Sequence, residues 1–330
     1  MKIFGGKEMK TKILKMVAVT SLVAGMFAGC TQPKTSTAET NDKLSVDKLV
    51  VTYVTSPLNV PSVIEKENHV FADNLKDVDI EYAEITSGAD QSQALASGDV
   101  QILHAIGGSS VIAAAAGGAD IKILNMYSRA PEAFALYSSN DSLNSPESLK
   151  GKTIAGPAGT NLHELLVAYL KKGNLTIDDV NFVSMSIPDA RAALEAGSID
   201  VAMLGGPAAY NADKSGLHKV RDGKGLIEAI ICVATTQKFY DEHKDVIDAF
   251  MNAQKQLRTF MQDNPEETKE IVEKVLELDD EAYEAMYGQY DFSLEVSQSD
   301  INGLQKTADF MYENGMIQTQ VDASSLFIQQ

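Results

Sequence analysis

The stretch 94–110, ALASGDVQILHAIGGSS, recurs in altered form 99 residues later as 193–209, ALEAGSIDVAMLGGPAA. Aligned without gaps, the copies share an initial Ala-Leu pair and two glycines, at 98 and 107 in the first copy and at 197 and 206 in the second. Each copy predicts a helix that ends at a glycine able to adopt positive φ. A short apolar strand follows, and then a glycine turn whose main-chain amides are free to bind a ligand. The repetition predicts two similar α/β lobes whose strand ends face each other.

The remaining chain alternates short β-rich segments with helical segments as far as residue 238. Outside the repeat we expect strands at 49–54, 78–85, 121–126, 133–137, 153–155, 182–185 and 230–235. Such alternation predicts parallel sheets flanked by helices. The last part of the chain is helical in pattern, at 243–261, 265–276, 281–290 and 299–312. We expect this tail to pack on the first lobe, because it has no sheet of its own to cover.

The composition restricts the classes of partner. The 330 residues suffice for two domains with separate cores. A formal net charge of −18 makes nucleic acid and anionic membrane surfaces poor partners for the body of the chain. A small anionic ligand remains compatible with this charge, because local amide dipoles outweigh a diffuse, screened field.

The N-terminus has the pattern of an exported protein. Lysines at 10, 12 and 15 precede the apolar run 16–29, which is too short for a comfortable membrane span. Ala28-Gly29-Cys30 resembles a bacterial lipoprotein box, which implies cleavage before Cys30 and a lipid on its sulfur; a plain signal peptide is the alternative. Met9 is a better start for such a signal than Met1. The polar stretch that follows predicts a flexible tether to the membrane.

Several turns that follow strands are candidates for an anion site, because ligands of open α/β sheets bind beyond the carboxyl ends of the strands. At least three of them lead directly into a helix and so supply unpaired amides and the positive end of a helix dipole. These turns are 55–57, 87–89, 107–110, 159–161 and 206–208.

Two motif combinations carry a resemblance to a known family. Ser87-Gly88-Ala89 is followed by Ala94-Leu95, Gly98-Asp99, Ile102 and a Gly-Ser-Ser turn, as in the nitrate/sulfonate/taurine family of solute-binding proteins of ABC importers. The 145–152 segment, the Gly-Thr-Asn helix start, Gly206-Pro207-Ala208 and the Gln237–Tyr240 segment are similar to that family and occur in its usual order. The resemblance covers roughly 49–317.

The resemblance implies a two-lobed type II periplasmic-binding-protein fold that closes on a small anion and delivers it to a permease and its ATPase. It also implies a monomer without a cofactor, outside the cytoplasm and anchored by the lipid on Cys30. By position, the expected ligand-binding residues are Ser56, Ser87, Gly88, Gly108, Ser109, Ser110, Thr160, Asn161, Gly206 and Pro207. The expected division of the chain is a lipoprotein signal peptide at 1–29, a tether at 30–46, the first lobe at 47–132 and 231–330, and the second lobe at 133–230.

The chain departs from the taurine binders of that family, which have an aromatic residue ahead of the Pro-Ala turn. Here Gly205-Gly206 occupies that place and the chain has no tryptophan. An aromatic contact with the ligand would therefore come from one of four residues: Tyr53, Tyr127, Phe134 or Tyr210.

Four polar residues have two interpretations each. Arg129 could pair with a sulfonate or carboxylate, or form a structural salt bridge, for example with Glu132. His104 lies in an apolar strand and could face the cleft or the core. Asp90 and Asp189 could receive the ammonium of a zwitterionic ligand, although an acid is favoured in the first turn of any helix.

Enzyme motifs are missing from the sequence. There is no G-x-S-x-G, and His163-Glu164 lacks the second histidine of H-E-x-x-H because Val167 occupies its position. We therefore expect a binding protein for a sulfonate or taurine-like anion rather than an enzyme. The alternatives are an extracytoplasmic enzyme with cleft carboxylates, a sensor-associated binding protein, or a binder of nitrate or of a neutral heterocycle such as a vitamin precursor.

Overall fold

The computed structural model describes residues 43–55 and 57–328. The expected signal peptide, the expected lipidation site Cys30, both candidate start codons and Ser56 lie outside these residues, as does the expected tether up to residue 42. Within 43–46, the main-chain amide and hydroxyl of Ser45 both bond to the carboxylate of Asp245. No helix among the described residues combines the length and apolar character needed to cross a bilayer.

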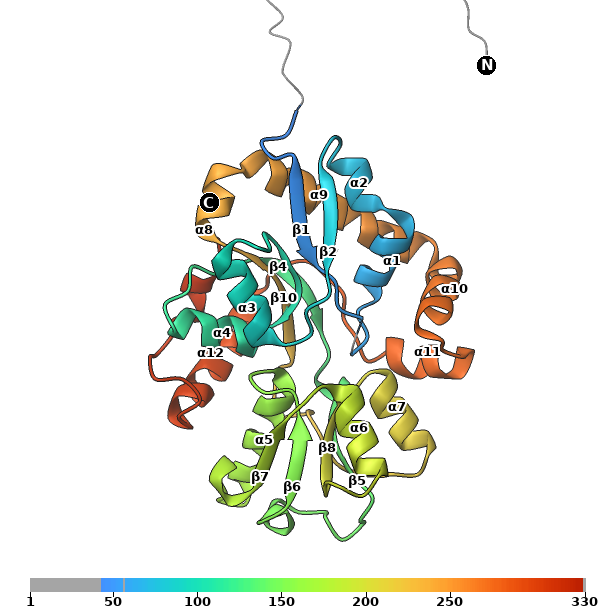
Figure 1. Ribbon diagram of the computed structural model, residues 1–330, viewed down its shortest axis with the longest axis vertical. Coiled ribbons are helices and arrows are strands. Elements are labelled where there is room, and N and C mark those ends of the chain that lie inside the picture. Colours follow the sequence, from blue (N-terminus) through green and yellow to red (C-terminus); the bar gives the residue numbers. More distant parts are fainter. Residues whose placement is uncertain (1–42, 56, 329–330) are drawn as a thin grey trace, which may run out of the picture. The chain divides into compact units, whose positions relative to one another are not determined.

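The first group of strands comes from both ends of the described chain (Figure 1). Strands β1 and β2 pair in parallel, and β10 lies between β3 and β4. A bridge between Val51 and Ile102 joins the two sets, so the spatial order is β2-β1-β3-β10-β4. Their bounds are β1 Lys48–Thr52, β2 Asp79–Ala83, β3 Leu103–Gly107, β4 Lys122–Arg129 and β10 Ile230–Thr235.

The second group of strands comes from the middle of the chain and forms one five-stranded sheet. Its order, β7-β6-β8-β5-β9, follows the same scheme as the first group. The bounds are β5 Phe134–Ser138, β6 Thr153–Gly156, β7 Asn181–Ser184, β8 Val201–Gly205 and β9 His218–Asp222.

The sheets are mixed, so the expectation of parallel sheets is wrong for one strand in each group. Strand β10 runs antiparallel to β3 and β4, and β5 runs antiparallel to β8 and β9. Both strands follow a crossing of the chain from one group to the other, β4 to β5 and β9 to β10. A strand that arrives from the facing group enters its sheet at the edge where the other strands end, and therefore runs against them.

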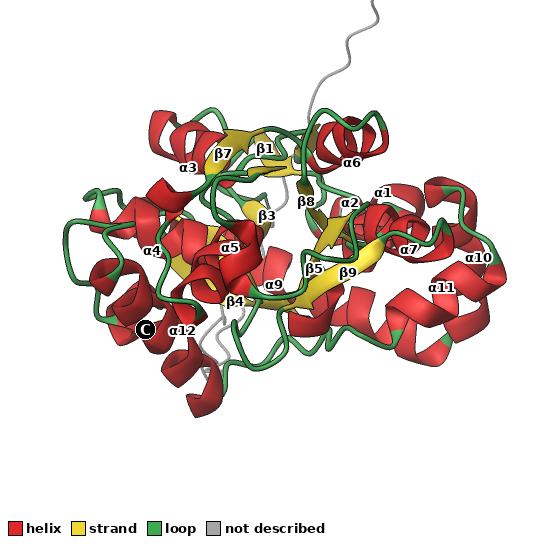
Figure 2. Ribbon diagram, turned by 90° about the horizontal axis from the view of Figure 1, so that it is seen from below, coloured by secondary structure: helices red, strands yellow, loops and turns green. Residues whose placement is uncertain are grey.

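Helices cover both groups of strands (Figure 2). Their bounds are α1 Val60–Asn68, α2 Val70–Asn74, α3 Gly88–Ser97, α4 Gly108–Ala116, α5 Asn161–Lys172, α6 Ile187–Glu195, α7 Pro207–Lys214, α8 Gln237–Glu242, α9 Lys244–Asp263, α10 Pro265–Leu276, α11 Asp280–Tyr287 and α12 Gln298–Glu313. Short 3₁₀ turns lie at η1 Pro131–Ala133, η2 Pro146–Leu149, η3 Ile177–Asp179 and η4 Ala323–Leu326. Helix α9 packs on α1 and α2, and α12 packs on α4, so the helical tail covers the first group of strands. Helix α11 also contacts α7 of the second group.

The glycines of the repeat have the expected conformation. Helix α3 ends at Gly98 with φ of 82°, and Gly197, which follows the end of α6, has φ of 69°. Strands β3 and β8 follow at equivalent places, and α4 and α7 begin directly after them. The repeat therefore gives each group of strands a helix that starts where its strand ends.

Candidate functional site

A cavity of about 80 Å³ lies where the strand ends of the two groups face each other. The first group and its connections contribute Val54, Pro57, Asn59, Thr86, Gly88, Gln91, Ala105, Gly107, Ser110 and Ile231. The second group contributes Phe134, Pro157, Thr160, Asn161, Leu162 and Ile187. None of these lining residues has a charged side chain.

Five helices begin at residues that line the cavity: α1, α3, α4, α5 and α6. Ser87 caps α3 by accepting a hydrogen bond from the amide of Asp90, while Gly107 and Thr160 are the capping residues of α4 and α5. The first-turn amides of a helix have no intrahelical acceptor and lie at the positive end of the helix dipole. The cavity therefore has the positive ends of five helix dipoles at its wall and no cationic side chain in its described lining.

Two side-chain hydrogen bonds join α4 to the start of α5 beside the cavity. The Ser109 hydroxyl donates to Asn161 Oδ1 at 3.0 Å, and the Ser110 hydroxyl donates to the Gly159 carbonyl at 2.7 Å. Asn161 Nδ2 in turn donates to the Ile230 carbonyl at 3.3 Å. The two groups of strands are thus bonded to each other at the cavity.

These hydroxyls direct their protons to protein oxygens. Ser109 and Ser110 do so as described, and Thr160 Oγ1 donates to the Pro157 carbonyl at 2.9 Å. A hydroxyl has one proton, so in this arrangement these three groups can only accept a further hydrogen bond. The donors that remain for an anion are therefore the main-chain amides of the helix starts and the hydroxyl of Thr86, which also lines the cavity.

The rest of the wall is largely apolar. Of the four aromatic residues considered from the sequence, Phe134 lines the cavity. Tyr53 packs edge-on against Tyr82 at 6.1 Å, and Tyr127 is buried in the core. Tyr210 lines a separate cavity of about 70 Å³. One aromatic ring thus faces the cavity, and it comes from β5.

Five of the described residues that the resemblance pointed to lie outside the cavity lining, and one of them, Gly206, is treated separately below. Ser87 caps α3 and Ser109 is buried beneath Asn161. A Cβ added at Gly108 would come within 2.6 Å of Leu304. Pro207 is the first residue of α7. Their positions favour structural support of the helix starts over direct contact with a ligand.

Gly206 is where the second group meets the loop after β1. Its φ is 57°, and a Cβ added there would overlap the carbonyl of Pro57. No other residue type combines this conformation with such a close approach. Gly206 therefore allows the two main chains to come into contact beside the cavity.

His104 faces the core. Its Nδ1 lies 3.2 Å from the Ser62 hydroxyl, and its ring is surrounded by Phe71, Tyr127 and Phe250. Burial, with a smaller contribution from the Arg258 charge, lowers the pKa of His104 to about 3. The imidazole is thus a neutral core residue and lies outside the cavity lining.

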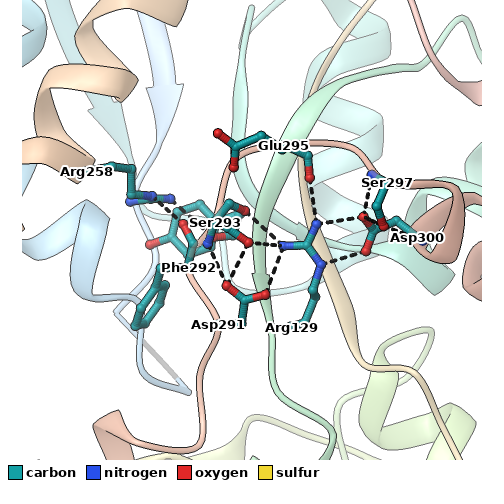
Figure 3. Close-up of polar contacts among 9 residues, drawn as sticks. Arg129, Arg258, Asp291, Phe292, Ser293, Glu295, Ser297 and Asp300 are labelled. Carbon is teal, nitrogen blue, oxygen red and sulfur yellow. Dashed lines mark hydrogen bonds and ion pairs between the residues drawn. The ribbon is translucent and has the colours of Figure 1, made fainter. Parts of the chain in front are cut away.

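Arg129 forms a salt bridge, but not with Glu132. Its Nε lies 2.6 Å from Asp300 Oδ1, and its Nη2 lies 2.7 Å from Asp300 Oδ2 (Figure 3). Nη1 donates to the Ser293 carbonyl at 2.9 Å. The expected Glu132 partner is wrong, because that carboxylate pairs with Lys224, whose Nζ lies 2.7 Å from Glu132 Oε1. The Arg129 guanidinium therefore bonds to residues in 291–300, the segment that leads into α12.

Neither aspartate that was considered for a ligand ammonium lines the cavity. Asp90 is exposed in the first turn of α3. Asp189 is exposed and accepts a hydrogen bond from the Ser186 hydroxyl at 2.6 Å. The described lining therefore has no carboxylate to neutralise an ammonium group.

Sequence reasoning missed three polar lining residues: Thr86, Gln91 and Asn59. Thr86 precedes Ser87 in the turn before α3, and Gln91 lies one turn into that helix. The Gln91 side chain is 2% exposed, and its Nε2 donates to the Ile85 carbonyl at 2.8 Å. Gln91 could have been predicted to line the cavity, because it lies three positions after Gly88 and therefore faces the same side of α3.

The arrangement matches solved periplasmic binding proteins. The alkanesulfonate-binding protein SsuA from Xanthomonas axonopodis pv. citri, bound to MOPS, superimposes with a TM-score of 0.78 at 21% identity. The match covers 86% of this chain and 99% of that one. The fold is therefore the α/β periplasmic-binding-protein fold.

Sequence comparison identifies the family. Residues 61–268 match the family described as NMT1/THI5 like, and the chain belongs to that family. A Bacillus subtilis protein named for binding aliphatic sulfonates is 25% identical over 325 residues, with 96% of this chain and 94% of that protein covered. The taurine-binding periplasmic protein of Escherichia coli is 29% identical over 205 residues, which cover 61% of this chain and 62% of that protein.

Proposed function

We propose that the protein binds a small organic anion, a sulfonate, in the cavity between the two groups of strands. The observation that carries the proposal is the convergence of five helix N-termini, those of α1, α3, α4, α5 and α6, on a cavity without charged side chains. Amide dipoles bind an anion of delocalised charge without a buried cation that would need its own partner. The relatives named for sulfonates and taurine support the same class of ligand.

The hydrogen-bond energy available at such a site is sufficient to bind a solute. A hydrogen bond to a charged group contributes about 1.5–3 kcal/mol, so four to six of them exceed the cost of ordering the solute and closing the site. We expect a net binding free energy of about −8 kcal/mol, which corresponds to micromolar affinity.

The volume of the cavity supports a small solute. A water molecule needs about 10–15 Å³ measured in the same way, so 80 Å³ corresponds to roughly five to eight water-sized atoms. A sulfonate with a short alkyl chain has this size. The apolar wall formed by Phe134, Leu162 and Ile187 would contact that chain.

The cellular role follows from the same proposal. The protein would capture its solute outside the cytoplasm as a monomer and deliver it to an ABC permease and its ATPase. Cleavage before Cys30 and a lipid on its sulfur would hold the protein at the membrane. The alternative of a cleft enzyme requires paired carboxylates, and the described lining offers none.

The proposal is tested by calorimetric titration of the purified chain with 1-propanesulfonate, taurine, nitrate and a pyrimidine vitamin precursor. We expect micromolar binding of 1-propanesulfonate with one site per chain and no turnover of the recovered ligand. Binding of the pyrimidine without any sulfonate binding would overturn the proposal, and so would a chemically altered ligand after incubation.

A further inference from the structure

A buried carboxylate joins α5 to the last helix of the chain. Glu164 is 4% exposed, and its Oε1 accepts a hydrogen bond of 2.9 Å from the hydroxyl of Thr307, itself 6% exposed. Helix α5 covers the second group of strands, whereas α12 packs on α4 of the first group. The Glu164–Thr307 bond therefore connects the two halves of the molecule away from the solvent.

The same helix carries the cavity residues. Glu164 lies one turn after Asn161, which together with Thr160 begins α5 at the cavity. A movement that separates α5 from α4 and opens the cavity would also separate Glu164 from Thr307 and admit water. Closure of the cavity therefore buries Glu164, and opening of the cavity exposes it to water.

The surroundings of Glu164 disfavour its charged form. Burial is the main cause and the nearby Glu228 carboxylate adds to it, while the hydrogen bond from Thr307 acts in the opposite direction. The pKa of Glu164 is raised to about 7 as a result. Lys306, the cation of α12 nearest in sequence to Thr307, is paired with Glu228 at 2.9 Å.

Among the described residues, the other elements that pack most extensively on α5 supply no cation for Glu164. Helix α4 and strand β8 have no titratable side chain. Lys171 of α5 itself pairs with Glu313 at the exposed end of α12. Two more titratable groups belong to packing elements, Tyr137 of β5 and Glu147 of η2.

We propose that Glu164 is a positioning residue that couples closure of the binding site to the uptake of one proton. The closed form contains the neutral carboxylic acid bonded to Thr307, and the open form contains the hydrated carboxylate. The inference rests on the proposed function only in that ligand binding is the event that closes the site.

The direction of the pH effect follows from the two states. In the structure the pKa of Glu164 is about 7. In the hydrated open form we expect the ordinary glutamate pKa of 4.5. Below pH 4.5 both forms are protonated and closure carries no penalty. Between these values closure takes up a proton, so affinity falls by up to about tenfold for each pH unit as pH rises. Above pH 7 the penalty is constant.

The variant Glu164→Gln removes the charge and keeps an oxygen that accepts the Thr307 bond. We expect it to bind 1-propanesulfonate at pH 8 at least about tenfold more tightly than the wild type, with no slope between pH 5 and 8. Thr307→Val removes the hydrogen bond from α12 that stabilises the charged form of Glu164 and so opposes the effect of burial on its pKa. It should weaken binding at pH 8, the opposite direction to Glu164→Gln.

The chain offers a matched control in Glu65. This carboxylate is 1% exposed and bonds to the Tyr82 hydroxyl and the Phe71 amide, all within the first half of the molecule. Burial raises its pKa to about 7 as well, although these hydrogen bonds oppose the shift. Glu65→Gln should therefore change the pH dependence of unfolding and leave the pH slope of ligand affinity as in the wild type.

A second measurement needs no ligand and separates this inference from the proposed function. Small-angle scattering of the ligand-free chain should show compaction as the pH is lowered from 8 to 5, and Glu164→Gln should be compact at both values. If no sulfonate binds but this compaction occurs, the proposed function fails and the proton coupling stands. A wild-type pH slope in Glu164→Gln, or a slope lost equally in Glu65→Gln, would overturn the coupling.

Discussion

Arg129, the last residue of β4, and Asp300, in the first turn of α12, form a doubly hydrogen-bonded ion pair across 171 residues of sequence. The Asp300 carboxylate also accepts hydrogen bonds from the amide and hydroxyl of Ser297, the capping residue of α12. The pair therefore fixes the start of the last helix to the point where the chain leaves the first group of strands (Figure 3). The Arg129–Asp300 pair therefore has a structural role, and the described lining of the cavity has no cationic side chain.

Removing this carboxylate should destabilise the fold at neutral pH. Burial alone would raise the pKa of Asp300, but hydrogen bonds from Arg129 and Ser297 lower it to about 2. A lowered pKa gives stability that is complete above the ordinary value of 3.8 and disappears as pH falls through about 2. Asp300→Asn should lower the free energy of unfolding by about 2 kcal/mol at pH 7, and by less at pH 3. Urea unfolding at both pH values measures this.

The control for that variant is Asp291→Asn. The Asp291 carboxylate lies 3.6 Å from Arg129 Nη1 and is 57% exposed, so its removal should cost less than about 1 kcal/mol. Equal losses in the two variants would show that the geometry of the Arg129–Asp300 pair is not what stabilises the helix start.

Thr160 allows the anion site to be tested without damage to the helix. Asp and Asn are both favourable capping residues, and an acid is favoured at a helix N-terminus. Thr160→Asp should therefore fold, but its carboxylate would repel a sulfonate in the cavity. We expect an affinity loss of at least about 100-fold by calorimetry with 1-propanesulfonate.

Thr160→Asn is the neutral variant of nearly the same size. It should remain within about tenfold of the wild type, because Asn is a favourable capping residue and adds no charge, and the Thr160 side chain makes no capping bond that would be lost. If Thr160→Asp binds as well as Thr160→Asn, the start of α5 does not contact the anion.

The cavity and its helix starts could be predicted from the sequence to a useful extent. The repeat locates the ends of β3 and β8, and Gly88, Ser110, Thr160 and Asn161 from the expected set line the cavity. These residues are predictable because strand ends and helix starts are local features. Their contact with a ligand remains a prediction.

The remaining features depend on distant contacts. Strand β3 is buried on both faces, so apolar periodicity could not show that His104 faces the core. The partner of Arg129 is separated from it by most of the chain. The antiparallel direction of β5 and β10 depends on the path of the crossings, which local sequence does not encode.

The cavity should discriminate between two solutes of equal size. Taurine and 1-propanesulfonate differ by an ammonium in place of a methyl group, and the described lining has no carboxylate for the ammonium. Burying an unpaired cation costs several kcal/mol, so taurine should bind at least about tenfold more weakly. Competition calorimetry measures the ratio directly. Tighter binding of taurine would show that a carboxylate reaches the bound solute.

Gly206→Ala tests whether contact between the two halves is needed for binding. The added methyl group would overlap the Pro57 carbonyl, and the positive φ adds backbone strain of about 1–3 kcal/mol. Gly98→Ala is the matched control, because Gly98 has φ of 82° but no atom within 4 Å of an added Cβ. Both variants should lose stability. Only Gly206→Ala should bind 1-propanesulfonate more weakly, by at least about tenfold. In small-angle scattering with this ligand, Gly206→Ala should also fail to become compact. Equal affinity losses in the two variants would show that backbone strain weakens binding. The Gly206–Pro57 contact would then have no role in closing the cavity.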